Sequence, residues 1–132
     1  MSMIAAHHDP AIIANGEAIL ANMKELCSSL VYAALLTDDG FEVSRIPVNQ
    51  VGDNRLASMA SSVQALSDAV ARELRIGLST YVVIASDHGH VIQRRVPGHP
   101  LVLAALFDND ETLGKALSIS RLSAERMSAL LT

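Results

Sequence analysis

Two adjacent carboxylates, Asp38 and Asp39, lie between an apolar run and a glycine in the stretch AALLTDDGFEVS. Such a pair could act as general acid and base, or could supply oxygen ligands to a hard metal ion. Acid–base catalysis would need one carboxylate with a raised pKa in a cleft. A second stretch, SDHG at residues 86–89, has the same order of hydroxyl residue, Asp, variable residue and Gly. Because Asp and Gly are typical of tight turns, we interpret both stretches as hairpin turns.

Histidines offer a second possible chemistry. His88 and His90 could bind a transition metal, together with His7 and His8 near the N-terminus. A metal site needs a defined number of ligands in a fixed geometry. Residues 1–9 are expected to be a mobile segment, and no third ordered ligand is suitably spaced. We therefore predict no metal site.

Other catalytic patterns are absent from the sequence. It contains no Gly-rich phosphate loop, no G-x-S-x-G and no H-E-x-x-H motif. The single cysteine, Cys27, falls on the apolar face of a predicted helix and is interpreted as a core residue. The sequence thus predicts no catalytic residues and no cofactor, and a protein that is not an enzyme.

Composition narrows the class of protein. The chain has 132 residues, of which 50% are hydrophobic and 3% aromatic, and its net charge is −4. This length favours one domain with an aliphatic core. The charge does not favour nucleic acid as a partner. The charge-free run 26–37 is shorter than the ~18 residues of a membrane span, and no signal peptide is recognisable. One cysteine in the sequence favours a reducing, cytoplasmic location.

The elements expected to position these residues alternate in type along the chain. Asp9 and Pro10 should begin a helix, although Asn15 and Gly16 predict that its regular part begins only near Glu17. Apolar patterns then predict strands at 30–36 and 41–46, a helix at 54–76 capped by Asp53, strands at 80–85, 90–96 and 101–107, and a helix at 111–131. Strands 30–36 and 101–107 are continuously apolar and should be central. The order predicts a single α+β domain, αββαβββα, over residues 1–132.

The middle helix carries three lines of residues. The first is predicted to face the core and comprises Leu56, Met59, Val63, Leu66, Val70 and Leu74. The second consists of small residues, Ser58, Ser62, Ala65 and Ala69, which either allow close approach of another helix or are simply tolerated at the surface. The third points away from the predicted core and comprises Ala57, Ser61, Gln64, Asp68, Arg72 and Arg75.

Four segments in this order resemble the Roadblock / dynein light chain family in its bacterial branch. They are LVYAALLTDDGFEVS, DNRLASMASSVQALSDAVARELRIG, YVVIASDHGHVIQRRV and LVLAALFDNDETLGKAL, and the resemblance runs from Leu30 to about Leu131. It implies a five-stranded antiparallel sheet of order 2-1-5-4-3 with helices on both faces. It also implies a non-catalytic dimer that serves as a platform for a small Ras-like GTPase and influences its nucleotide state or localisation. The polar segment 1–9 and the Asn15–Gly16 break depart from the family pattern.

Dimerisation has a further basis in the sequence. The strand at 80–85 carries no Lys or Pro that would prevent pairing at a sheet edge. We expect two copies to pair there across a two-fold axis, through Ser58, Ser62, Ala65, Ala69, Tyr81, Val82, Val83 and Ile84. The GTPase is then expected to bind the third line, Ala57, Ser61, Gln64, Asp68, Arg72 and Arg75. The open alternatives are a ligand- or metal-responsive dimeric module or small enzyme, and a self-assembling scaffold without a GTPase.

Overall fold

The computed structural model describes residues 4–47 and 55–132. After a short 3-10 helix, η1, the elements follow the predicted order of helix, two strands, helix, three strands and helix. Their bounds are η1 Ala6–His8, α1 Pro10–Leu26, β1 Leu30–Thr37, β2 Glu42–Ile46, α2 Arg55–Glu73, β3 Tyr81–Ser86, β4 Gly89–Arg95, β5 Leu101–Phe107 and α3 Leu113–Leu131. The predicted α+β class is confirmed. The predicted cap of α2, Asp53, lies outside the described residues.

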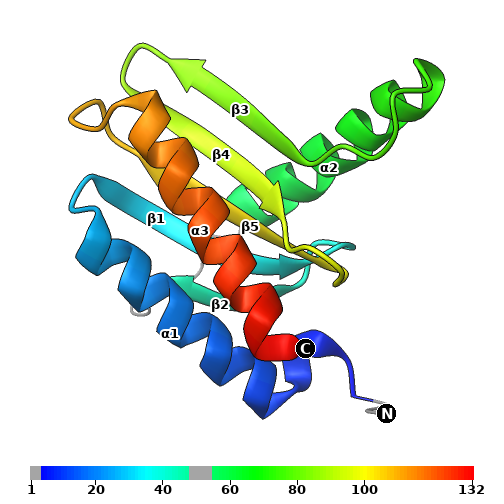
Figure 1. Ribbon diagram of the computed structural model, residues 1–132, viewed down its shortest axis with the longest axis horizontal. Coiled ribbons are helices and arrows are strands. Elements are labelled where there is room, and N and C mark those ends of the chain that lie inside the picture. Colours follow the sequence, from blue (N-terminus) through cyan, green and yellow to red (C-terminus); the bar gives the residue numbers. More distant parts are fainter. Residues whose placement is uncertain (1–3, 48–54) are drawn as a thin grey trace.

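The five strands form one antiparallel sheet in the order β2-β1-β5-β4-β3. This confirms the expected order 2-1-5-4-3, with the two continuously apolar strands, β1 and β5, at or next to the centre. Helices α1 and α3 lie side by side over one face of the sheet, and α2 lies behind the other face (Figure 1). The last turns of α2 project beyond the β3 edge (Figure 1). The fold is therefore a three-layered arrangement with one helix that overhangs.

The two faces of the sheet are packed very differently. Under α1 and α3 lies the main core, which contains large side chains such as Leu20, Met23, Ile92 and Phe107. Under α2 the buried cluster is small and consists of Ala34, Leu36, Ala57, Ala60 and Ala104. Since hydrophobic stabilisation scales with the apolar area removed from water, α2 gains much less from burial than α1 and α3 do.

Helix α1 begins at Pro10 behind the cap Asp9, as predicted, and it is regular from that point. Asp9 caps it by accepting a 3.0 Å hydrogen bond from the backbone N–H of Ala11, and Pro10 fills the first position. Gly16 does not interrupt the helix, and it is buried against β2. A Cβ at residue 16 would overlap the hydroxyl of Ser44. The expected start of its regular part near Glu17 is thus wrong, because Gly16 permits a close helix–sheet approach rather than breaking the helix.

Residues 4–9 belong to the N-terminal segment that was expected to be mobile. Its η1 turn lies beside the β1–β2 hairpin, where the ring of His7 stacks on Phe41 with 4.5 Å between centroids and an interplanar angle of 8°. The side chains of Ala6 and Ile12 pack on the adjoining core cluster. Part of the segment expected to be mobile therefore contacts the sheet layer.

The two Asp-Gly turns differ in structure. Gly40 has a φ of 91°, which favours glycine, as the turn prediction requires. Gly89 instead lies inside β4, where a Cβ would come within 2.7 Å of the Phe107 carbonyl oxygen. Both stretches join antiparallel strands, as the hairpin prediction requires, but of these two glycines only Gly40 has the positive φ of a turn residue. At residue 89, glycine allows close packing of β4 on β5.

Candidate interaction surface

The surface that stands out on this fold is the outward side of α2. The helix faces the sheet with Ala57, Ala60 and Gln64, which are buried, and Ala71 is buried beside the segment that connects α2 to β3. The line predicted to face the core is instead half-buried or exposed, and Leu66 has an exposed fraction of 67%. Met59, Leu66, Val70 and Leu74 are exposed and Val63 is half-buried beside the sheet edge, whereas Leu56 packs against the cluster under α2, as predicted. The assignment is wrong by roughly one residue's rotation, ~100° about the helix axis.

Polar contacts explain this orientation. Gln93, on the α2 side of β4, is 3% exposed. Its side-chain amide donates to the backbone carbonyl of Ala60 and to the side-chain oxygen of Gln64, both at 2.9 Å. A buried amide is destabilising unless its hydrogen bonds are made. The face of α2 that can satisfy Gln93 is therefore the one that turns to the sheet.

A salt bridge extends these contacts toward the end of β4. Gln64 donates to a carboxylate oxygen of Asp68 at 3.1 Å, and Arg95 donates to both Asp68 oxygens at 3.0 Å. Arg95 also reaches the Asp38 carboxylate at 3.4 Å. Asp38 thus links its hairpin to this network, which corrects its interpretation as a turn residue alone. Asp39 does act within the turn, because it accepts a 2.6 Å hydrogen bond from the Thr37 hydroxyl.

Sequence reasoning missed Gln93 and Arg95, although a signal for them existed. Both residues lie on one face of a strand, because side chains two residues apart point the same way. Polar residues at two such positions on a strand that a helix covers indicate a polar partner on that helix. The predicted apolar line on α2 offered no such partner, whereas the line with Gln64 and Asp68 did.

Strand β3 forms an open edge of the sheet beside α2. It pairs with β4 only, among the strands that the structure describes. The backbone N–H of Arg95 donates to the Thr80 carbonyl, so alternate residues of β3 face β4. Tyr81, Val83 and Ala85 consequently turn their backbone N–H and C=O groups to the open side. The edge is also partly apolar, since Tyr81 and Ile84 are exposed.

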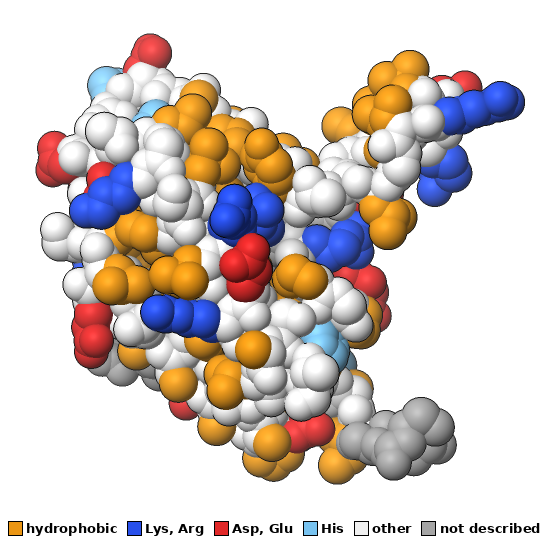
Figure 2. Space-filling view, viewed as in Figure 1, with side chains coloured by type: hydrophobic (Ala, Val, Ile, Leu, Met, Phe, Trp, Pro, Cys, Tyr) orange, Lys and Arg blue, Asp and Glu red, His pale blue; other side chains and the backbone are white. Residues whose placement is uncertain are grey.

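A groove joins this edge to α2. It has a volume of about 500 Å³ and is lined by Leu56, Ser58, Met59, Ala60, Ser62, Val63, Ile84, Val91 and Gln93. Beyond it, the projecting end of α2 stands clear of the body, with hydrophobic side chains on its upper surface and basic side chains at its tip (Figure 2). Exposed fractions there reach 71% for Ile76 and 80% for Leu78. Contiguous exposed apolar surface of this kind is typical of protein–protein contacts.

The residues predicted to form the dimer lie in this region. Ser58 and Ser62 line the groove, and Val82 and Ile84 border the spaces beside α2. Ala65 and Tyr81 are exposed, whereas Ala69 and Val83 are half-buried. The structure therefore places Val82 and Ile84 on the same side of the sheet as α2, whereas Val83 packs into the main core under α1 and α3, and Tyr81 lies against Arg94 on that opposite face.

The residues predicted to bind a partner are divided by the structure. Ala57 and Gln64 are buried against the sheet, and Asp68 is paired with Arg95. Ser61 is half-buried. The expectation that this line points away from the core is wrong for these four, because the polar network turns them inward. Arg72 and Arg75 alone in the set are exposed, at the projecting end.

Other candidate chemistry is limited. No group of three or more His, Cys, Asp or Glu side chains is placed to hold a metal within residues 4–47 and 55–132. Cys27 is buried, and its thiol donates to Glu111 at 3.1 Å. Burial raises the pKa of Cys27, while the thiol's hydrogen bond lowers that of Glu111. A thiol with a raised pKa is a poor nucleophile.

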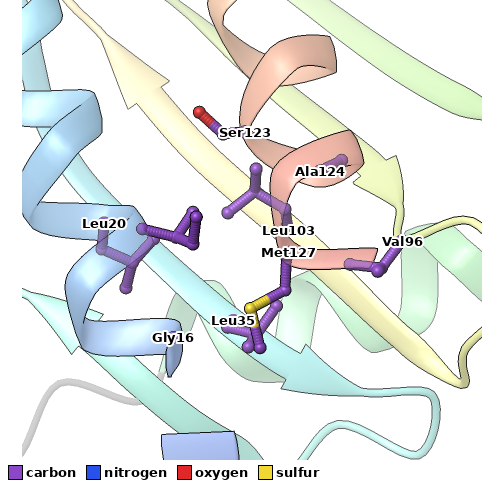
Figure 3. A pocket seen from close by; sticks show the side chains of 9 residues that line it. Gly16, Leu20, Leu35, Val96, Leu103, Ser123, Ala124 and Met127 are labelled. Carbon is purple, nitrogen blue, oxygen red and sulfur yellow. The ribbon is translucent and has the colours of Figure 1, made fainter. Parts of the chain in front are cut away.

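The interior seam between α1, α3 and the sheet is closed. Figure 3 shows its lining, in which Leu20 and Leu103 approach Ser123, Ala124 and Met127. The side chains leave no room for a water-sized molecule. The seam is close packing around small residues rather than a ligand cavity.

In the described part of the chain, no helix is long and apolar enough to span a membrane.

Solved structures share this architecture over nearly the whole chain. The gliding protein MglB of Thermus thermophilus superposes with a TM-score of 0.78 at 16% sequence identity, covering 93% of this chain and 92% of that one. MglB of Myxococcus xanthus gives 0.81 at 14% identity, with 99% and 94% coverage. A Roadblock/LC7 domain from Streptomyces avermitilis gives 0.77 at 16% identity, with 86% and 95% coverage. The chain has the Roadblock/LC7 fold.

The resemblance seen in the sequence is thereby confirmed at the level of structure. No protein-family model matches the chain, and no curated protein matches it in sequence. At 14–16% identity the likeness establishes the Roadblock/LC7 fold and its strand order. Function must be argued from the surface that this fold presents.

Proposed function

We propose that the protein is a dimeric, non-catalytic regulator that binds a small Ras-like GTPase and influences its nucleotide state or localisation. We infer the dimer from one observation: the apolar side of α2 adjoins a sheet edge whose backbone groups face outward. The Roadblock/LC7 fold supports the regulatory role. The partner class comes from the family resemblance of the sequence.

The surface is suited to a second copy of itself. One part is a groove floored by Ile84 and Val91, and the other is an apolar arm that includes Leu66, Ile76 and Leu78. A two-fold axis at the β3 edge would place the arm of each copy over the sheet of the other. The groove would then receive side chains whose burial stabilises by roughly 1.5–3 kcal/mol each. The edge backbone groups of β3 would pair in the same contact.

The GTPase would meet the exposed end of α2. Arg72 and Arg75 are exposed there, and Arg is enriched among residues that dominate binding energy. Small Ras-like GTPases from the same organism can be purified and loaded with GDP or a non-hydrolysable GTP analogue. Calorimetric titration should give saturable binding to at least one of them in one nucleotide state. Absence of binding across the organism's set would overturn the partner assignment and favour the scaffold alternative.

A further inference from the structure

The polar contacts under α2 have a role beyond holding the helix in place. We propose that Gln93, Gln64, Asp68 and Arg95 act as positioning residues that fix the rotation of α2, and so keep its apolar side available to a second copy. This proposal deepens the dimer proposed above and rests on it for its functional consequence. The rotation itself is a property of the single chain and can be tested separately.

Packing alone would favour a different rotation. The sheet presents a mostly apolar surface to α2, including Leu36, Val91 and Ala104. The apolar line of α2, which includes Met59 and Leu66, lies roughly 100° from the side that faces this surface. Rotation by that amount would bury large side chains that are now exposed. The observed rotation buries alanines and glutamine instead.

Hydrogen bonding opposes that alternative. Both N–H groups of the Gln93 side chain are used, one by Ala60 O and one by Gln64 Oε1. Rotation of α2 would remove Gln64 from reach and leave the buried amide without that partner. It would also separate Asp68 from Arg95, whose two 3.0 Å hydrogen bonds are charge-assisted. The contacts run from the second turn of α2, at Ala60, to its fourth turn, at Asp68, so they specify both rotation and axial position.

The consequence concerns the dimer. With the helix turned by the network, the apolar line faces the groove and the β3 edge, where a second copy would bind. With the network removed, the chain could bury the same line against its own sheet. Self-association and internal packing would then compete for one set of side chains.

A thiol probe can report the rotation. Ala57 is 6% exposed and faces the sheet, whether the chain is single or paired. In an Ala57→Cys parent, the new thiol should be protected from maleimide. Gln93→Val in that parent removes both donors and retains a residue suited to a strand. We expect the residue-57 thiol of this variant to label at least tenfold faster, and its dimer dissociation constant to rise at least tenfold. Buried Cys27 provides an internal control, because it should label only on global unfolding.

Two further variants keep the test decisive. Arg94→Val alters the adjacent residue on the opposite face of β4 and should leave the residue-57 thiol protected. Should Gln93→Val unfold, with both thiols labelling together, Asp68→Ala disrupts the network at a half-buried position. It should raise labelling about threefold without labelling of Cys27. Unchanged protection at residue 57 in every folded network variant would overturn the proposal.

The two proposals fail in distinguishable ways. A parent that stays monomeric at all concentrations overturns the dimer, while labelling at residue 57 still decides the rotation. A parent that dimerises, together with a folded Gln93→Val variant that dimerises equally well, overturns the positioning role and leaves the dimer standing.

Discussion

The side-chain amide of Gln93 on β4 donates a 2.9 Å hydrogen bond to the side-chain oxygen of Gln64 on α2, and both residues are buried. This contact sets a polar side of the helix against the sheet. The larger apolar side chains, such as Leu66, are left in solvent. In this orientation a single chain leaves the apolar side of α2 exposed to water. That exposure is the physical basis for expecting a second copy.

The contact between Gly16 and Ser44 gives a stability prediction. Gly16→Ala should lower the free energy of unfolding by about 1–3 kcal/mol, because its Cβ would overlap the Ser44 hydroxyl in a packed interior. The Ser44 hydroxyl is buried and has no hydrogen-bond partner among residues 4–47 and 55–132. Ser44→Ala should therefore be neutral or stabilising, and should recover part of the loss in the double variant. Urea unfolding of all four proteins measures the coupling, and strict additivity would contradict the contact.

The β1–β2 turn gives a pH prediction. The hydrogen bond from the Thr37 hydroxyl holds the pKa of Asp39 below its usual value of 3.8. A lowered native pKa stabilises the fold above the unfolded value, and this contribution is lost as pH falls through the native value. Asp39→Asn should therefore lower the melting temperature at pH 7, with the difference from wild type shrinking below about pH 4. A difference that is constant from about pH 7 to about pH 2 would contradict this linkage.

Asp38 should contribute less to the stability of the fold than Asp39 does, and its contribution should depend on its charge. Its carboxylate is 3.4 Å from Arg95 at an exposed position, where an ion pair contributes about 0–1 kcal/mol. Asp38→Asn should thus reduce the free energy of unfolding by less than about 1 kcal/mol at low salt, and the difference should diminish at high salt. Chemical denaturation at two salt concentrations tests this. A larger loss that persists in high salt would assign Asp38 a role other than ion pairing.

The partner-binding prediction concentrates on two residues. Arg72→Glu combined with Arg75→Glu should abolish binding of the GTPase, because both side chains are exposed at the projecting end of α2. Neither residue belongs to the core clusters, so circular dichroism and melting temperature should stay close to wild type. Arg121→Glu on α3 is a matched control at an exposed site. Wild-type affinity in the double variant would show that the GTPase binds at another surface.

Local patterns were sufficient to predict most of the fold. Continuous apolar runs identify β1 and β5 as central strands, and the turn residues separate every element. The sequence predicts the Asp9–Pro10 start of α1 correctly but wrongly delays its regular part to Glu17, because the packing partner of Gly16, Ser44 on β2, is distant in sequence. A glycine that breaks a helix and one that admits a neighbouring strand look alike in a sequence.

The surface was harder to predict than the fold. The strongest apolar periodicity of α2 predicts its buried side, as is usual for a helix that packs within one chain. Two tertiary contacts, Gln93 with Gln64 and Arg95 with Asp68, override that preference. Burial of a side chain by its own sheet and burial by a second copy produce the same sequence pattern. The predicted dimer residues on α2 lie on its outer side, and their role in pairing stays a prediction, while most of the predicted partner line turns inward.

Sedimentation equilibrium at low micromolar concentration tests the central claim, that the exposed side of α2 and the β3 edge bind a second copy. Wild type should have the mass of two chains. Leu66→Asp should have the mass of one chain with an unchanged far-UV circular dichroism spectrum, because Leu66 is 67% exposed in the single chain. Leu122→Asp, at an exposed position on α3, should remain a dimer. A folded wild-type protein with the mass of one chain would contradict the account.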